Sequence, residues 1–335
     1  MELHKNEPLL QVKELKTYFP VYGGALSTLQ GYVHAVDNVS FDVYPGETLG
    51  VVGESGCGKT TMAQSIMRIV PATSGQVFYK GEDLLKFSSK QMREVRREIQ
   101  IIFQDPFSSL DPRMSVGQII EEPLIIHKVK DPEERKKRVL KVMDLVGLPS
   151  AYYNRYPHEF SGGQRQRISI ARAIVLDAKI IFCDEPVSAL DVSIQSKILN
   201  LLRDLQAELG LTFVFISHAL NVVRHISDRV CVMYLGKIME IAPAEHIFEQ
   251  AAHPYTQALL SAIPIPDPDK HRQRILLTGD IPSPRNPPSG CRFHTRCPNA
   301  TQRCACEEPP LVEYAPGHMV ACHFCSHEAC EEATK

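Results

Sequence analysis

The sequence predicts an α/β domain built on a largely parallel sheet, followed by a smaller cysteine-rich region. Between residue 9 and about residue 242, short apolar runs alternate with longer segments of helical period, the pattern of strands joined by crossover helices. At roughly 150 residues per domain, the 335 residues suffice for about two folding units. Seven of the ten cysteines follow residue 290, and prolines concentrate in 263–273 and 281–290. We therefore predict one unit over 9–260 and a second over 261–335.

The expected strands follow from short runs rich in β-branched or aromatic residues. Five such runs predict buried strands at 48–54, 99–105, 179–185, 212–218 and 229–236. Two earlier segments, 9–19 and 34–44, alternate more and predict antiparallel strands with one face in water.

The helices between these strands are expected to pack one apolar face on the core. One stripe of helical spacing is predicted to be core and consists of Ile194, Ile198, Leu201, Leu202, Leu205 and Leu209. No strand candidate occurs from about 115 to 175, and residues 131–148 form a densely charged helical segment. We therefore predict a helical subdomain at about 107–175, inserted in the sheet domain, with a solvated charged face.

Charge and hydropathy exclude some classes of protein. The 37 Lys and Arg balance 39 Asp and Glu, a formal charge of −2, which argues against a nucleic-acid binder with a broad basic surface. No apolar run approaches the roughly 18 residues of a membrane-spanning helix. The first residues, MELHKNEPLL, lack the apolar segment of a secretory signal, so we expect a cytosolic chain in which disulfides are disfavoured.

A phosphate-binding loop is predicted between the strand at 48–54 and the next helix. Residues 53–60 fit the pattern G-x-x-x-x-G-K-[ST]. Backbone N–H groups in such a loop form an anion nest, Lys59 would reach the β and γ phosphates, and Thr60 would ligate Mg²⁺. The predicted nucleotide-binding residues are Gly53, Glu54, Ser55, Gly56, Cys57, Gly58, Lys59, Thr60 and Thr61. Cys57 either occupies a variable position of the loop or is a thiol of lowered pKa.

Two carboxylates end the apolar strand at 179–185. Asp184 is predicted to hold Mg²⁺ at the carboxyl end of a buried strand, where ligands of open α/β sheets collect. Glu185 is predicted to polarise the water that attacks the γ-phosphate. The chain contains no Asn-Lys-x-Asp motif for guanine, so adenine is the expected base.

With these two motifs, the run Ser161-Gly162-Gly163-Gln164 resembles the signature motif of the ATP-binding subunits of ABC transporters. It precedes Asp184 by 23 residues, as in that family. A hydroxyl and free N–H groups at a helix start suit an anion. The resemblance implies a P-loop NTPase fold of the ABC type, with an antiparallel β subdomain and a RecA-like core. It also implies head-to-tail dimers in which each signature motif contacts ATP held by the other domain.

Four further positions resemble functional residues of this family. Gln104 resembles the Q-loop glutamine that contacts Mg²⁺ and the water, and Asp191 lies in a segment that resembles the D-loop at the dimer interface. His218 resembles the switch histidine near the γ-phosphate, although Ala219 follows it where the family usually has an acid. For the aromatic that stacks on adenine, Phe19 is our first choice and Tyr18 our second; either could instead be a core aromatic.

Segments 234–240, 253–269 and 282–300 resemble the oligopeptide and dipeptide importer ATPases, in particular the second of their two ATPase subunits. This resemblance covers residues 9 to about 323. It implies a second, non-identical ATPase subunit, two permease subunits, an external peptide-binding protein and a place at the cytoplasmic face of the membrane. An importer ATPase for a metal complex or other small molecule is the alternative, followed by a soluble ATPase associated with nucleic acid.

The C-terminal cysteines predict a metal site, since cytosolic clusters of this kind are more often metal sites than disulfides. Members of the importer family hold a [4Fe-4S] cluster in this tail, which implies the ligands Cys291, Cys297, Cys304 and Cys322. Zinc is an alternative, with candidate ligands in His294, His318 and His323, as are cysteines without metal. The remaining thiols could be idle or compete for the metal, and they are Cys306, Cys325 and Cys330.

Overall fold

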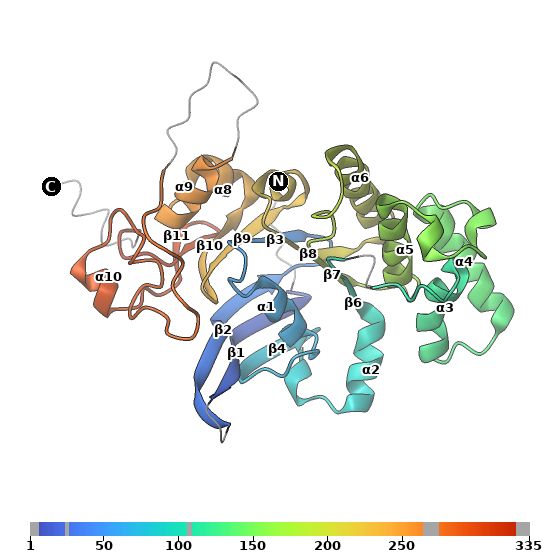
Figure 1. Ribbon diagram of the computed structural model, residues 1–335, viewed down its shortest axis with the longest axis horizontal. Coiled ribbons are helices and arrows are strands. Elements are labelled where there is room, and N and C mark those ends of the chain that lie inside the picture. Colours follow the sequence, from blue (N-terminus) through green and yellow to red (C-terminus); the bar gives the residue numbers. More distant parts are fainter. Residues whose placement is uncertain (1–6, 24–26, 106–108, 264–274, 326–335) are drawn as a thin grey trace, which may run out of the picture. The chain divides into compact units, whose positions relative to one another are not determined.

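The chain folds into two compact units whose segments alternate along the sequence. The computed structural model describes residues 7–23, 27–105, 109–263 and 275–325 (Figure 1). We call the first unit the helical unit, and its described residues lie within 44–48 and 86–216. We call the second the phosphate-loop unit, and its described residues lie within 7–43, 49–85 and 217–325. Among the described helices, none is both long and apolar enough to cross a membrane.

The phosphate-loop unit contains the antiparallel strands that the alternating segments predict. Their order is β2-β1-β4-β5, and the strands are β1 (Leu10–Gly23), β2 (Thr28–Val43), β4 (Ser74–Tyr79) and β5 (Glu82–Asp83). The predicted strand at 9–19 continues to Gly23, and the one at 34–44 begins at Thr28, so the hairpin is longer than predicted. Its outer part is exposed on both strands, with Tyr22 opposite Leu29, and therefore lacks the hydrophobic alternation of a half-buried strand.

A second set of strands in this unit carries the phosphate loop. Their order is β11-β12-β10-β9-β3, with bounds β3 (Thr48–Val52), β9 (Arg229–Tyr234), β10 (Lys237–Pro243), β11 (Val312–Ala315) and β12 (His318–Val320). β3 and β9 are parallel, and all five β3 residues are buried. Strands buried on both faces need apolar residues at successive positions, so the windows at 48–54 and 229–236 could be recognised in the sequence.

The C-terminal tail belongs to the same compact unit as the phosphate loop. β12 pairs with β10 in antiparallel register, Glu240 opposite Val320, and β11 pairs with β12. The short helices of this unit are α1 (Lys59–Ile66), α7 (Leu220–Ile226), α8 (Ala244–Gln250), α9 (Pro254–Ser261) and α10 (Gln302–Cys306). The domain boundary near residue 260 stays a prediction, but residues 275–325 contribute strands to this unit.

The helical unit has three parallel strands and most of the long helices. The strands pair in the order β8-β7-β6 and are β6 (Ile99–Ile102), β7 (Ile180–Asp184) and β8 (Thr212–Ser217). The helices are α2 (Ser89–Glu98), α3 (Val116–Ile126), α4 (Pro132–Leu145), α5 (Gly162–Ile174) and α6 (Val192–Leu209). α3, α4 and α5 pack on one another (Figure 1), and no strand occurs in the described residues 109–175.

The remaining expectations for secondary structure are confirmed in this unit. Each of the windows at 99–105, 179–185 and 212–218 contains a strand that ends one to three residues before the window does. In α6 the middle of the predicted apolar stripe is buried, and the two terminal members, Ile194 and Leu209, are half-buried. The stripe is therefore core packing, as expected for an amphipathic helix.

Candidate functional site

The phosphate loop runs from β3 to α1 and is packed tightly against neighbouring backbone. Gly53 has φ 154° and Gly58 has φ 106°, conformations that L side chains rarely adopt. A Cβ atom at Gly53 would lie 2.2 Å from the carbonyl oxygen of Met233, and one at Gly58 would lie 2.1 Å from that of Ala35. Only glycine fits at these two positions, so the spacing of the motif is a packing requirement of the loop.

Lys59 lies beneath the loop rather than on the surface. Its Nζ donates to the carbonyl oxygens of Gly53 at 2.8 Å and Glu54 at 3.0 Å, and the residue is 5% exposed. Thr60 is exposed in the first turn of α1, where a hydroxyl can reach a metal ion. Burial raises the pKa of the Cys57 thiol, so the alternative of a thiol with lowered pKa is wrong. Contacts of the loop with phosphate stay predictions.

The two candidate adenine-stacking aromatics have different environments. Tyr18 donates its hydroxyl hydrogen bond to Asp37 at 2.5 Å, and its ring lies 4.3 Å from that of His34. Phe19 is 38% exposed and has an apolar face to offer a base. β1 contacts α1, since the hydroxyls of Thr17 and Ser65 are 2.8 Å apart. The structure thus favours Phe19 over Tyr18 for stacking, and the assignment stays a prediction.

The predicted catalytic carboxylates end β7 in the helical unit. Asp184 is 4% exposed at the last position of the strand. Glu185 follows in the left-handed region with φ 48°, an unusual conformation for a side chain of this size and one found often at functional sites. Gln104, after β6, donates its amide to Oε2 of Glu185 at 2.9 Å. The structure therefore brings Gln104 and Glu185 together, as a shared site requires.

The signature segment begins α5. Ser161 is exposed at the N-cap of this 13-residue helix, and its hydroxyl accepts from the N–H of Gln164 at 3.4 Å, while Gln164 accepts from the N–H of Ser161 at 3.0 Å. A Cβ at Gly163 would lie 2.5 Å from the side chain of Ile194, so this glycine permits close packing on α6. Asp191 caps α6 by accepting from the N–H of Ile194, and its hydrogen bond from Ser193 lowers its pKa.

His218 follows β8 and is exposed. Ala219 occupies the N-cap of α7, where no side chain accepts a hydrogen bond from the helix. The N–H of Ala219 instead donates to the hydroxyl of Ser217 at 3.0 Å. Because Ala219 stands where the family usually has an acid, α7 lacks a side-chain cap directly beside the predicted switch histidine.

Comparison with known proteins decides the family. The model described as ABC transporter matches residues 36–188, and that described as oligopeptide/dipeptide transporter, C-terminal region, matches residues 239–304. The chain is 50% identical over 329 residues to the oligopeptide transport ATP-binding protein AppF of Bacillus subtilis, covering 97% of this chain and 100% of that protein. The chain belongs to the ATP-binding subunits of oligopeptide and dipeptide ABC transporters.

Further relatives and solved structures agree with this family. The chain is 51% identical over 316 residues to the dipeptide transport ATP-binding protein DppF of Escherichia coli, with 94% of each chain covered. The structure of cbiO1 from Clostridium perfringens, part of the ABC transporter complex cbiONQ, is 29% identical with a TM-score of 0.63 and covers 73% of this chain and 92% of that chain. The dimeric ATP-binding cassette MJ0796, bound to ADP and Pi, is 29% identical with a TM-score of 0.62 and covers 70% and 98%. The predicted ABC ATPase fold, and with it the use of ATP and Mg²⁺, is confirmed.

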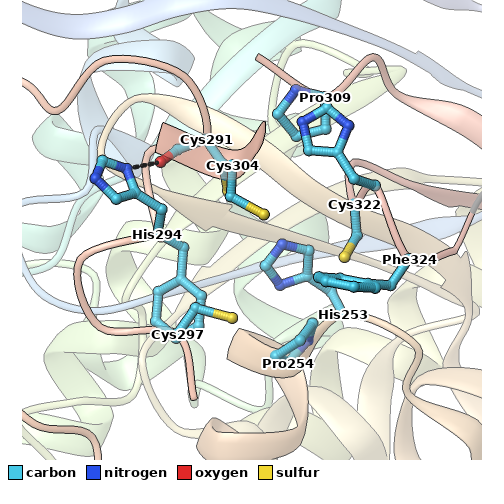
Figure 2. Close-up of a pocket in the computed structure, with 11 residues that line it drawn as sticks. His253, Pro254, Cys291, His294, Cys297, Cys304, Pro309, Cys322 and Phe324 are labelled. Atoms are coloured by element: carbon cyan, nitrogen blue, oxygen red, sulfur yellow. Dashed lines mark hydrogen bonds between the residues drawn. The ribbon is translucent and has the colours of Figure 1, made fainter. Parts of the chain in front are cut away.

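The four cysteines that the family resemblance singles out line one pocket of the tail. Figure 2 shows Cys297, Cys304 and Cys322 turned toward this pocket, which Cys291 also lines. Burial raises the pKa of Cys291 to about 11, whereas a hydrogen bond from Cys325 lowers the pKa of Cys322 to about 7. As placed, no group of three or more His, Cys, Asp or Glu side chains in the described part of the chain could hold a metal ion.

The other tail residues named from the sequence fall inside and outside this pocket. His294 and His323 line it, whereas His318 is buried against Glu240, with its Nε2 2.7 Å from Oε1 of that carboxylate. Cys306 is exposed, Cys325 is buried, and Cys330 lies outside the described residues.

Sequence reasoning missed the residues that surround the thiols. His253, Pro254 and Phe293 also line the pocket, and the first two begin α9, far from the cysteines in sequence. The available signal was the run 291–297, C-R-F-H-T-R-C, in which both arginines are largely buried. Lys and Arg side chains are rarely buried without a partner, but their burial here is visible only in the structure, so the sequence did not indicate these ion pairs.

Proposed function

We propose that this chain is the ATPase subunit that powers uptake of oligopeptides or dipeptides through a membrane ABC importer. The observation that carries the ATPase part of this proposal is the contact between Gln104 and Glu185, which joins the predicted sensor of the nucleotide to the predicted catalytic carboxylate. The match of residues 239–304 to the oligopeptide/dipeptide C-terminal region supports the substrate class. Relatives that are half identical over nearly the whole chain are named oligopeptide and dipeptide transport ATP-binding proteins.

In this proposal the residues of the helical unit and of the phosphate-loop unit have separate tasks. Gly53 to Thr61 bind the phosphates of ATP, and Phe19 stacks on adenine. For Mg²⁺, Thr60 would offer a ligand from the phosphate-loop unit, and Gln104 and Asp184 are the candidate ligands of the helical unit. Glu185 accepts a proton from the attacking water, and His218 contacts the γ-phosphate.

The phosphate loop of this chain is proposed to bind the chain's own ATP, so the signature motif needs a nucleotide that is held by a second subunit. Ser161 is exposed at the N-terminus of α5, where a hydroxyl, backbone N–H groups and the helix dipole together suit an anion. We propose that Ser161, Gly162, Gly163 and Gln164 contact ATP held by a second, non-identical ATPase subunit, with Asp191 at the interface. ATP then closes a head-to-tail dimer, and hydrolysis opens it.

The same proposal assigns the remaining partners and the place of the complex. Two multi-span permease subunits hold the ATPases at the cytoplasmic face of the membrane, and an external binding protein delivers the peptide. Affinity purification from solubilised membranes tests this assignment. Recovery of a second ATPase and two permeases supports it, and recovery of ribosomal or DNA-repair proteins without a membrane subunit contradicts it.

We also propose that the tail pocket holds a [4Fe-4S] cluster. The chemistry of the donors suits such a group, because four thiols line one pocket whose other walls include Phe293, Phe324 and Pro309, although as placed they do not form a ready metal site. The ligands would be Cys291, Cys297, Cys304 and Cys322, and the group would fasten a tail region that has little core of its own. Zinc is the alternative, because four thiols also suit Zn²⁺ and His294, whose Nδ1 lies 2.8 Å from the Cys291 carbonyl oxygen, leaves Nε2 for a metal.

Anaerobic purification and subsequent iron, sulfide and zinc analysis test the metal assignment. The proposal predicts iron and sulfide in equal amounts and their loss in a Cys297→Ser variant. Zinc without sulfide would contradict the cluster and support a zinc site. Absence of iron, sulfide and zinc would refute a metal site.

A further inference from the structure

The segment 291–297 connects the thiol pocket to the nucleotide-binding elements of its own unit. Its first and last residues, Cys291 and Cys297, line the pocket. Its two arginines point to other partners: Arg292 pairs with Asp37, and Arg296 pairs with Glu54. Both partners lie more than 240 residues earlier in the sequence, and all of these residues belong to the phosphate-loop unit.

The pair of Arg296 with Glu54 acts on the phosphate loop itself. Nη1 of Arg296 donates to Oε2 of Glu54 at 2.8 Å, and Nη2 donates to Oε1 at 3.2 Å. The arginine side chain is 9% exposed and the glutamate 23%, so water screens the pair only in part. Two parallel charged hydrogen bonds fix the direction of the carboxylate as well as its position.

The pairing also neutralises the negative charge of Glu54 within the phosphate loop. Glu54 is the second residue of a loop whose task is to bind the negative phosphates of ATP. An unpaired carboxylate there would repel the ligand and would be free to approach the N–H groups of the nest. The guanidinium of Arg296 neutralises this charge and holds it in a fixed place.

An aromatic cluster provides a second connection between the same segment and the loop. Phe293 is fully buried, and its ring lies 5.3 Å from Tyr255 and 5.4 Å from Tyr234. The hydroxyl of Tyr255 accepts a hydrogen bond from the backbone N–H of Glu54 at 3.0 Å. The side chain and the backbone of Glu54 are therefore both held by residues that pack on, or belong to, the segment 291–297.

Arg292 is connected to Cys57 of the same loop through Asp37 and two backbone hydrogen bonds. Its Nη2 donates to Oδ2 of Asp37 at 2.5 Å. The N–H of Asp37 donates to the carbonyl oxygen of Gly236 at 2.8 Å, and the N–H of Gly236 donates to that of Cys57 at 2.9 Å. A continuous chain of polar contacts thus runs from the residue after Cys291 to the phosphate loop.

We propose that Arg296 is a positioning residue of the phosphate loop, and that it couples the thiol pocket to nucleotide binding. Order in the segment 291–297 favours the binding-ready loop, and bound nucleotide favours order in the segment. Such coupling is reciprocal, so ATP protects the thiols by the factor by which the ordered segment tightens ATP binding. The two sites bias one shared element, which is the physical requirement for coupling.

The first test measures equilibrium ATP binding by the full chain, well below its unfolding temperature. Arg296→Ala is expected to raise the Kd about tenfold, within the usual range of coupling between sites. Arg296→Lys keeps the charge but loses the two-pronged geometry, and is expected to give an intermediate Kd. The matched control is Arg303→Ala, which removes an exposed arginine paired with Glu307 on the same tail and should leave the Kd unchanged.

A double-mutant cycle with Glu54→Gln separates positioning from general loosening. If Arg296 acts through Glu54, Arg296→Ala should have little further effect on the Kd in the Glu54→Gln background. Should Arg296→Ala fail to fold, the same cycle is run with Arg296→Lys. Equal effects of the arginine substitution in both backgrounds would refute the positioning role.

The second test reads the coupling from the thiols and needs no bound metal. The chain is treated with a chelator, which is then removed by gel filtration. Alkylation of Cys297 by iodoacetamide is monitored by mass spectrometry with and without ATP and Mg²⁺. We expect ATP to slow the reaction several-fold in the wild type but not in Arg296→Ala, while the exposed Cys306 reacts at one rate throughout. Equal protection in both proteins, or none in either, would overturn the proposal, whatever the metal analysis shows.

Discussion

Glu185→Gln isolates the proposed chemical step from binding and folding. The substitution exchanges one carboxylate oxygen for an NH₂ group and leaves the shape of the side chain unchanged. The bond from Gln104, now 2.9 Å long, can be kept by the remaining oxygen, and the N–H of residue 185 still donates to Ile216. The amide cannot accept a proton and carries no charge, so general-base assistance and the negative charge are removed while the shape is kept.

The magnitude depends on the loss of that assistance. General acid–base catalysis contributes about 10²- to 10⁴-fold, which corresponds to about 3–5 kcal/mol of activation free energy. We expect turnover by the complete complex to fall by this factor, with ATP affinity within about threefold of the wild type. The assay combines phosphate release with retention of labelled ATP on the purified complex, and Glu133→Gln, an exposed residue of α4, is the control. Normal turnover by Glu185→Gln would refute the assignment of the catalytic base.

Three further predictions concern the phosphate loop, the switch helix and a buried histidine that lines the thiol pocket. Lys59→Ala should abolish nucleotide binding or hydrolysis in equilibrium binding and turnover assays, because it removes a buried cation from the loop. Ala219→Asp should add the missing cap of α7 and stabilise the chain by about 0.5–2 kcal/mol in urea unfolding; no change would mean that the helix is already capped by other groups. Burial lowers the pKa of His253 to about 4, so unfolded chains bind a proton between pH 6.5 and 4 that folded chains do not. Stability should therefore fall by on the order of 2 kcal/mol from pH 7 to pH 5, and less in His253→Asn, where an amide oxygen can still accept from the N–H of Tyr255.

Local patterns were sufficient to predict the loop, the carboxylates and most strands. The glycines of the phosphate loop are required by backbone contacts at Gly53 and Gly58, so their spacing in the sequence reports the geometry directly. The end of β7 was predicted to within one residue because a buried strand has apolar residues at successive positions, and this end determines where Asp184 and Glu185 lie. Their roles in catalysis stay predictions. The exposed part of the β1–β2 hairpin has no such pattern, and its length was underestimated.

The choice between Tyr18 and Phe19 shows where periodicity fails. Side chains alternate between the two faces of a regular strand, but the pairing of β1 with β2 shifts between Leu15 and Thr17 and again between Thr17 and Tyr18. Each shift changes which residues share a face, and no feature of the sequence marks these positions. Only the structure shows that the Tyr18 hydroxyl donates a hydrogen bond to Asp37.

The contact of Arg296 with Glu54 could not be foreseen for a related reason. The two residues are 242 positions apart, and each looks like an ordinary polar residue of a loop. Their pairing depends on the tail packing through Phe293 on Tyr234 and Tyr255, which is a tertiary event without periodicity. The same holds for the convergence of the thiols with His253 at the start of α9.

Peptide uptake by the reconstituted complex tests the central claim most directly. The complex that co-purifies with this chain is placed in liposomes with ATP on the ATPase side and labelled peptides, with their binding protein, on the other. We predict uptake that requires ATP and is lost with Glu185→Gln in this chain. Hydrolysis of ATP without movement of any peptide, while another solute is carried, would contradict the proposed function.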